Sequence, residues 1–256
     1  MTTTSLTTTT PTSTAATARG LTKTFESTGR GVEVPALRGI DLDIPAGRFT
    51  AIMGPSGSGK STLMHCLAGL DQPTAGAVTV AGQRLDGLAD DDLTRFRRDH
   101  VGFVFQSFNL LPMLTAEQNI WLPTELAGAR RPDLGDRFDQ VVDTLGLRDR
   151  LTHRPAELSG GQQQRVAVAR ALVSRPAIVF ADEPTGNLDS AASAEVLAFL
   201  RRSVRELGQT VVMVTHELEA AAYADDVVIL TDGRITARLT EPSPDALVAA
   251  LKARAA

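Results

Sequence analysis

The sequence contains little cysteine and no long apolar run. Its single cysteine, Cys66, excludes an internal disulfide and a cysteine-ligated zinc cluster, and it fits a reducing compartment. The longest apolar runs fall far short of the roughly 18 to 20 residues that an α-helix needs to span a bilayer. We therefore expect any role at a membrane to depend on a partner protein.

An excess of basic charge is also absent. The chain has 26 lysine and arginine residues against 30 aspartate and glutamate residues, which gives a formal net charge of −4. Domains that bind DNA or RNA are usually basic, because they neutralise phosphate charge. The charge balance therefore predicts no nucleic-acid partner.

The first residues offer almost nothing that could be buried. Residues 1–17 form a threonine-rich tract without the basic start or the apolar segment of a secretory signal. Such a tract cannot offset the entropy cost of ordering. We expect residues 1–17 to be a disordered tail, residues 18–240 to form one domain, and residues 241–256 to form a short C-terminal helix or tail.

The remaining sequence alternates between short apolar runs and amphipathic segments. Runs such as "RFTAIMG" (48–54), "VGFVFQ" (101–106) and "TVVMVTH" (210–216) predict buried strands, and helical segments follow several of them. Residues 112–172 interrupt this alternation, because their pattern is helical throughout. The sequence thus predicts an α/β fold with a mostly parallel central sheet and a helical insert.

A glycine-rich stretch, "GPSGSGKST", lies between a predicted strand and a predicted helix. It matches the pattern G-x-x-x-x-G-K-[ST], whose backbone N–H groups surround phosphate oxygens at a helix N-terminus. Lys60 would reach the β- and γ-phosphates, and Ser61 would ligate Mg²⁺. A plain glycine-rich turn is the alternative. The candidate phosphate-binding residues are Gly54, Pro55, Ser56, Gly57, Ser58, Gly59, Lys60, Ser61 and Thr62.

Two adjacent acids end the apolar run "IVFADEP" (178–184). Side chains alternate along a strand, so Asp182 and Glu183 would point in different directions. Asp182 suits Mg²⁺ coordination, and Glu183 suits a general base for an attacking water. The alternative is a pair of solvated loop acids at a strand end.

A second glycine-rich helix start occurs about a hundred residues after the first. Ser159, Gly160 and Gly161 precede an amphipathic helix and offer N–H groups without bulky side chains, which is an anion site. One phosphate loop already suffices for one nucleotide. We therefore expect a symmetric homodimer, in which each copy offers this helix start to the γ-phosphate that the other copy holds. A capped helix with a glycine turn is the alternative.

Together these motifs resemble the ATP-binding subunit of ABC transporters over about residues 18–238. The stretch 54–62 resembles the Walker A motif, 158–162 ("LSGGQ", ending at Gln162) the signature, and 178–184 Walker B. The resemblance implies a P-loop NTPase domain with a mostly parallel central sheet, an antiparallel β subdomain and a helical insert at about 112–172. ATP and Mg²⁺ are the implied cofactors.

The resemblance also assigns roles to single residues. Gln106 would sense Mg²⁺ or the attacking water, His216 would contact the γ-phosphate, and Asp189 would pass information across the dimer. Taken alone, His216 is more typical of a surface or capping residue and Asp189 of a helix N-terminal acid. Phe25 would stack on adenine, and a core phenylalanine is the alternative.

Within the family, the stretches "GFVFQSFNLLPMLTAEQNIWLP" and "ADEPTGNLDS" resemble the macrolide-exporter and lipoprotein-release group. That group implies a homodimer beneath an integral membrane permease with few helices and an extracytoplasmic domain, at the cytoplasmic face of the plasma membrane. The apolar loop 107–114 is the candidate permease contact, and an internal core loop is the alternative. A regulatory ATPase of cell division and a soluble ABC ATPase are rival functions.

Overall fold

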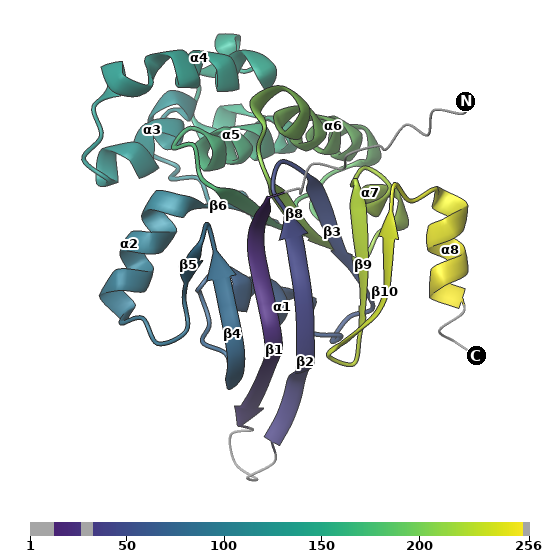
Figure 1. Ribbon diagram of the computed structural model, residues 1–256. Helices are drawn as coiled ribbons and strands as arrows, with labels where there is room; N and C mark the ends of the chain where they lie inside the picture. Colours follow the sequence, from purple (N-terminus) through teal and green to yellow (C-terminus); the bar gives the residue numbers. More distant parts are fainter. Residues whose placement is uncertain (1–12, 27–32, 253–256) are drawn as a thin grey trace, which may run out of the picture.

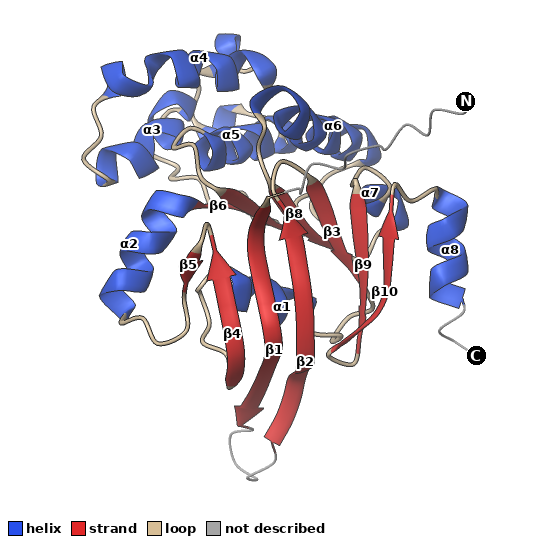
Figure 2. Ribbon diagram, viewed as in Figure 1, coloured by secondary structure: helices blue, strands red, loops and turns tan. Residues whose placement is uncertain are grey.

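Two β-sheets and a group of helices make up the structure (Figures 1 and 2). The computed structural model describes residues 13–26 and 33–252. The larger sheet has the strand order β10-β9-β3-β8-β7-β6. Its strands are β3 (Phe49–Met53), β6 (Val101–Phe105), β7 (Ile178–Asp182), β8 (Val211–Thr215), β9 (Asp226–Thr231) and β10 (Arg234–Thr240).

This central sheet is parallel except at one edge. Strands β9, β3, β8, β7 and β6 pair in parallel, and β10 returns antiparallel to β9 through a hairpin. Every residue of β3 and β8 is buried, because other elements cover both faces of the sheet. A continuously apolar sequence is typical of strands in such a position. The mostly parallel sheet expected from the sequence is confirmed.

The smaller sheet is antiparallel and has the strand order β2-β1-β4-β5. Its strands are β1 (Thr14–Glu26), β2 (Glu33–Pro45), β4 (Ala75–Val80) and β5 (Gln83–Arg84). Helix α1 (Lys60–Leu67) lies between the two sheets, and its buried side chains join those of both in one apolar core. The implied antiparallel β subdomain is confirmed.

The helices that fall within residues 116–207 lie beside one another on one side of the central sheet, at the top of Figure 2. Their apolar faces share a second core with strands β3, β7, β8 and β9. The α-helices are α2 (Asp90–His100), α3 (Ala116–Leu126), α4 (Gly135–Thr144), α5 (Gly160–Leu172), α6 (Ser190–Leu207), α7 (Leu218–Ala221) and α8 (Pro244–Lys252). Short 3₁₀ helices are η1 (Arg131–Leu134), η2 (Arg148–Arg150) and η3 (Pro155–Glu157).

The predicted disordered tail, residues 1–17, is wrong at its C-terminal end. Residues 14–17 belong to β1, and residues 1–12 lie outside the described residues. Ala16 and Ala18 are buried where β1 pairs with β2 on one side and β4 on the other. Alanine and threonine carry little apolar surface, so composition alone gave no sign of a central strand. Pairing on both edges supplies the stability that the side chains lack.

A capping box starts α3. The Thr115 hydroxyl accepts from the Gln118 N–H, and the Gln118 side chain accepts in return from the Thr115 N–H. Helices α3, α4 and α5 fill the chain between β6 and β7, the segment that interrupts the strand–helix alternation in the sequence. Within residues 13–26 and 33–252, no helix combines the length and the apolar character needed to cross a membrane.

Candidate functional site

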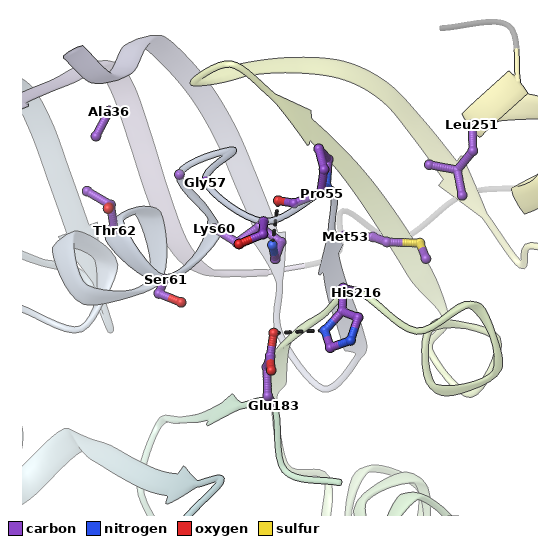
Figure 3. A pocket seen from close by; sticks show the side chains of 13 residues that line it. Ala36, Met53, Pro55, Gly57, Lys60, Ser61, Thr62, Glu183, His216 and Leu251 are labelled. Carbon is purple, nitrogen blue, oxygen red and sulfur yellow. Dashed lines mark hydrogen bonds and ion pairs between the residues drawn. The ribbon is translucent and has the colours of Figure 1, made fainter. Parts of the chain in front are cut away.

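A cavity of about 760 Å³ lies past the carboxyl ends of the parallel strands β3, β7 and β8 (Figure 3). Ligands bind at this edge in many open α/β sheets. Most of the predicted phosphate-binding residues line it, together with Glu183 and His216 from the next strand ends. The full lining is Ala36, Met53, Gly54, Pro55, Ser56, Gly57, Gly59, Lys60, Ser61, Thr62, Glu183, His216 and Leu251.

The loop between β3 and α1 lies in close contact with the backbones of both sheets. A Cβ on Gly54 would collide with the Leu230 carbonyl oxygen of β9, and one on Gly59 would lie 2.5 Å from the Ala36 carbonyl oxygen of β2. Gly59 also has a φ of 99°, which residues with a Cβ rarely adopt. No larger residue fits either place. The Ser58 side chain is buried behind the loop and does not line the cavity.

Lys60 is the first residue of α1 and is only 7% exposed. Its Nζ donates to the Pro55 carbonyl oxygen at 2.8 Å, and an ammonium has two further N–H donors. Burial lowers the pKa of Lys60, and the carboxylates of Glu183 and Asp182 oppose that shift. A cation and a helix N-terminus therefore meet at the cavity wall, an arrangement that attracts anions.

Ser61 and Asp182 form an oxygen pair beside this cation. The Ser61 hydroxyl donates to Asp182 Oδ1 at 3.3 Å, and burial raises the pKa of Asp182. Among the described residues, no three or more His, Cys, Asp or Glu side chains gather as a metal cluster. Mg²⁺ does not require one, since it is commonly held by one or two protein oxygens with water and substrate phosphates. The pair fits Mg²⁺.

Glu183 and His216 lie next to each other at the cavity, directly after the ends of β7 and β8. His216 Nδ1 lies 3.0 Å from Glu183 Oε1, and Figure 3 shows both side chains facing the space beside Lys60. Glu183 has a φ of 43°, a left-handed conformation that costs about 1 to 3 kcal/mol in a residue with a side chain. Its N–H donates to Val214 O of β8, which holds the turn.

Gln106 follows β6 but does not line the cavity. Its Nε2 donates to Asn187 Oδ1 at 3.3 Å, and Asn187 Nδ2 donates back to the Gln106 carbonyl oxygen at 3.1 Å. A Cβ on Gly186 would lie 2.7 Å from Gln106 Nε2, so only glycine leaves room for this contact. Asn187 is a partner that sequence reasoning missed.

The start of α5 also lies outside the cavity of its own chain. Ser159 and Gln162 form a capping box, and a Cβ on Gly161 would lie 3.0 Å from the Ala192 Cβ of α6. Gly160 likewise faces Leu188. Close packing against the start of α6 thus explains why glycine occupies both positions, independently of anion binding. Asp189 caps α6 by accepting from the Ala192 N–H at 2.9 Å.

Phe25 lies near the end of β1 and does not line the cavity either. It is 43% exposed, with Lys23 Nζ 5.0 Å from the ring centroid, so the alternative of a core phenylalanine is wrong. Three lining residues, Ala36, Met53 and Leu251, were not predicted. Nothing in the local sequence of Leu251 indicates that α8 reaches the cavity.

The parallel sheet and the glycine loop that leads into α1 define a P-loop nucleotide-binding domain. The sequence matches the ABC transporter family over residues 37–186, which is more than half of the chain. A macrolide export ATP-binding/permease protein, MacB, of Marinobacter nauticus is 48% identical over 223 residues, 87% of this chain and 34% of that protein. An uncharacterised ABC transporter ATP-binding protein of Thermotoga maritima is 48% identical over 204 residues, 80% of this chain and 87% of that protein.

Solved structures agree with these matches. A dimeric structure of MJ0796, a bacterial ABC transporter cassette, is 39% identical with a TM-score of 0.78, covering 89% of this chain and 99% of that one. The chain belongs to the ABC transporter family and carries its nucleotide-binding domain. It spans about a third of the length of the macrolide export proteins that it matches.

Replacing Lys60 tests the cavity as an anion site. Hydrogen bonds to charged groups contribute about 1.5 to 3 kcal/mol, so Lys60→Ala is expected to weaken ATP binding about 10- to 100-fold. Titration with a fluorescent ATP analogue measures the affinity. Lys252→Ala, an exposed lysine of α8, is the control and should bind as the unchanged chain does. Equal affinity in Lys60→Ala would contradict the phosphate-loop assignment.

Proposed function

We propose that this chain is the ATP-binding and ATP-hydrolysing subunit of an ABC transporter and works as a homodimer with a membrane permease. The observation that carries the proposal is the position of Glu183 and His216, side by side across the cavity from the phosphate loop. A phosphate loop alone would indicate only that the chain binds ATP. A carboxylate aimed at the same space indicates hydrolysis.

In this proposal the triphosphate lies along the loop 54–62, where backbone N–H groups, the α1 N-terminus and Lys60 Nζ bind its oxygens. Ser61 and Asp182 would hold Mg²⁺, exchanging their mutual hydrogen bond for the ion. The ion, when bound, neutralises phosphate charge. Phe25 is the proposed stacking partner for adenine, and its exposed ring is available for that contact.

Glu183 acts as the general base. Its carboxylate accepts a proton from the water that attacks the γ-phosphorus, and the bond to the leaving ADP oxygen breaks. His216 orients Glu183 through their 3.0 Å contact and contacts the γ-phosphate. Gln106 must break its hydrogen bonds with Asn187 before its side-chain amide can approach Mg²⁺ or the attacking water.

The proposal of a homodimer is based on three signature residues that lie outside the cavity. Ser159, Gly160 and Gly161 do not line the cavity of their own chain, which supports a second copy as their source. MJ0796, the 39% identical cassette, has been solved as a dimer in a post-hydrolysis state with ADP and Pi. In the closed dimer each signature helix start would cover the other copy's γ-phosphate, and Asp189 would lie at the boundary between copies.

The permease would dock beside the apolar loop 107–114. Leu111 and Met113 are 41% and 67% exposed, so the alternative of an internal core loop is wrong. An apolar groove of about 410 Å³ adjoins the loop, with Phe103, Phe105 and Leu126 in its walls. Arg170 fixes the loop by donating to the Phe108 and Asn109 carbonyl oxygens. A permease segment would insert apolar side chains into this groove.

The similarity to proteins named for macrolide export supports export, or transmission of motion, across the membrane. The chain would then sit at the cytoplasmic face of the plasma membrane, held there by a few-helix permease with an extracytoplasmic domain. A regulatory ATPase of cell division and a soluble ABC ATPase are the competing functions, and the identity of the co-purifying partner distinguishes them.

Glu183→Gln is expected to retain ATP binding and to lose at least about 100-fold in turnover, because general bases contribute about 10²- to 10⁴-fold. Steady-state phosphate release measures turnover, and analogue titration measures binding. Glu219→Gln, an exposed acid of α7, is the matched control and should hydrolyse normally. Near-normal turnover in Glu183→Gln would remove the general-base role.

A complementation experiment tests the composite site. Lys60→Ala and Ser159→Arg should each be inactive as pure homodimers. In a mixed dimer, the intact loop of one copy meets the intact signature of the other, so an equal mixture should recover about a quarter of normal turnover. If each site belonged to a single chain, mixing would recover nothing.

Met113→Asp tests the permease surface. It should abolish co-purification of a membrane protein with tagged chain from detergent-solubilised membranes, while ATP binding stays unchanged. Leu70→Asp, 45% exposed and outside the groove lining, is the control and should retain the partner. Retention by Met113→Asp, or the absence of any membrane partner with the unmutated chain, would contradict the docking proposal.

A further inference from the structure

A second polar cavity, of about 460 Å³, lies at the opposite end of the central sheet from the loop 54–62. Ala46 and Gly47 precede β3, Pro176 and Ala177 precede β7, and Gln209 and Thr210 precede β8. The amino ends of these strands therefore form its floor. Arg137 and Gln140 of α4 and Arg175, which follows α5, form the rest of the lining with Leu207 and Gly208.

Arg137 is a buried cation in this lining. It is 6% exposed, yet among residues 13–26 and 33–252 no carboxylate pairs with it. Its one hydrogen bond in that part of the chain runs from Nε to the Leu172 carbonyl oxygen at 3.3 Å. A guanidinium has five N–H donors, so the four on Nη1 and Nη2 remain without a protein acceptor there.

A second cation, Arg175, lies in the same lining as Arg137. Burial lowers the pKa of Arg137, and the positive charge of Arg175 lowers it further. Neither Nη1 nor Nη2 of Arg137 is a fully buried atom without a partner, so the guanidinium opens onto the cavity. A second cation in the same lining is unfavourable for its charge. Arg175 is exposed and makes no ion pair within the described residues.

Helix capping accounts for only part of this arrangement. Leu172 is the last residue of α5, and a cation is favourable beside the carbonyl groups at a helix C-terminus. That contact occupies a single Arg137 donor. It leaves the four donors on Nη1 and Nη2 unused. The α5 C-terminus also favours the nearby charge of Arg175, but that side chain makes no hydrogen bond within the described residues.

We propose that this cavity binds a small molecule carrying an oxyanion, either a phosphate or a carboxylate group, with Arg137 as a two-pronged donor and Arg175 as the second cation. The paired N–H groups of a guanidinium match two oxygens of either group. The volume falls in the range of about 300 to 1,000 Å³ typical of small-molecule pockets, which leaves room for an uncharged part of the ligand.

Hydrogen bonds within the protein hold the floor of this cavity in place. Gln209 is 5% exposed, and its Nε2 donates to the Pro176 and Thr210 carbonyl oxygens, at 3.0 and 3.3 Å. The Thr210 hydroxyl accepts from the Gly47 N–H at 2.9 Å. These bonds join the loops before β3, β7 and β8 without using either arginine. The site is separate from the phosphate loop and would be occupied independently of the proposed ATPase function.

Equilibrium dialysis with radiolabelled inorganic phosphate tests the proposal. The full chain is first saturated with a non-hydrolysable ATP analogue and Mg²⁺, so that the phosphate loop cannot contribute. The unmutated chain should bind one phosphate per chain. Arg175→Gln should weaken that binding at least tenfold, while Arg201→Gln, an exposed arginine of α6 outside the cavity, should change it less than twofold.

Competition with succinate then separates the two chemistries. Displacement of phosphate shows a site open to carboxylates and phosphates, and no displacement shows a phosphate site; either result supports the proposal. Arg137→Gln should also lose binding, and Arg175→Gln keeps the test valid if Arg137→Gln fails to fold. No bound phosphate and no bound labelled succinate, or equal binding in Arg175→Gln and Arg201→Gln, would overturn it.

Discussion

Close contact between the phosphate loop and the backbones of both sheets determines the rest of the site. Gly54 lies against the Leu230 carbonyl of β9, and Gly59 lies against the Ala36 carbonyl of β2. Neither place has room for a Cβ. The loop therefore presents its N–H groups to a ligand from a position that the two sheets fix together, and α1 can begin there with Lys60 against the Pro55 carbonyl.

The same parallel sheet brings the proposed catalytic side chains to the cavity. Strands β7 and β8 are neighbours, and their carboxyl ends place Glu183 and His216 within 3.0 Å of each other although 33 residues separate them. The left-handed turn at Glu183 is held by the Val214 carbonyl of β8. The start of α5, which lies beyond β6 in the helical segment, does not line the cavity of its own chain.

The sequence was informative where one local pattern demands one chemistry. The loop 54–62 and the end of β7 could be predicted because a phosphate needs glycines and a lysine, and a buried parallel strand reads as an apolar run. No strand was predicted over β1, because alanine and threonine give no hydrophobic signal at its start. Contacts between distant segments, such as Asn187 with Gln106 or Leu251 with the cavity, leave no mark on either local sequence.

The two ends of the central sheet differ in their electrostatics. At the carboxyl ends, the N-terminus of α1 and Lys60 both attract an anion. At the amino ends, α5 and α6 finish at Leu172 and Leu207, and their C-terminal carbonyl groups repel one. An anion in the second cavity would therefore depend on the arginine side chains alone, without support from the backbone. Binding there should be weaker than at the phosphate loop and more sensitive to salt, because Arg175 is exposed to solvent.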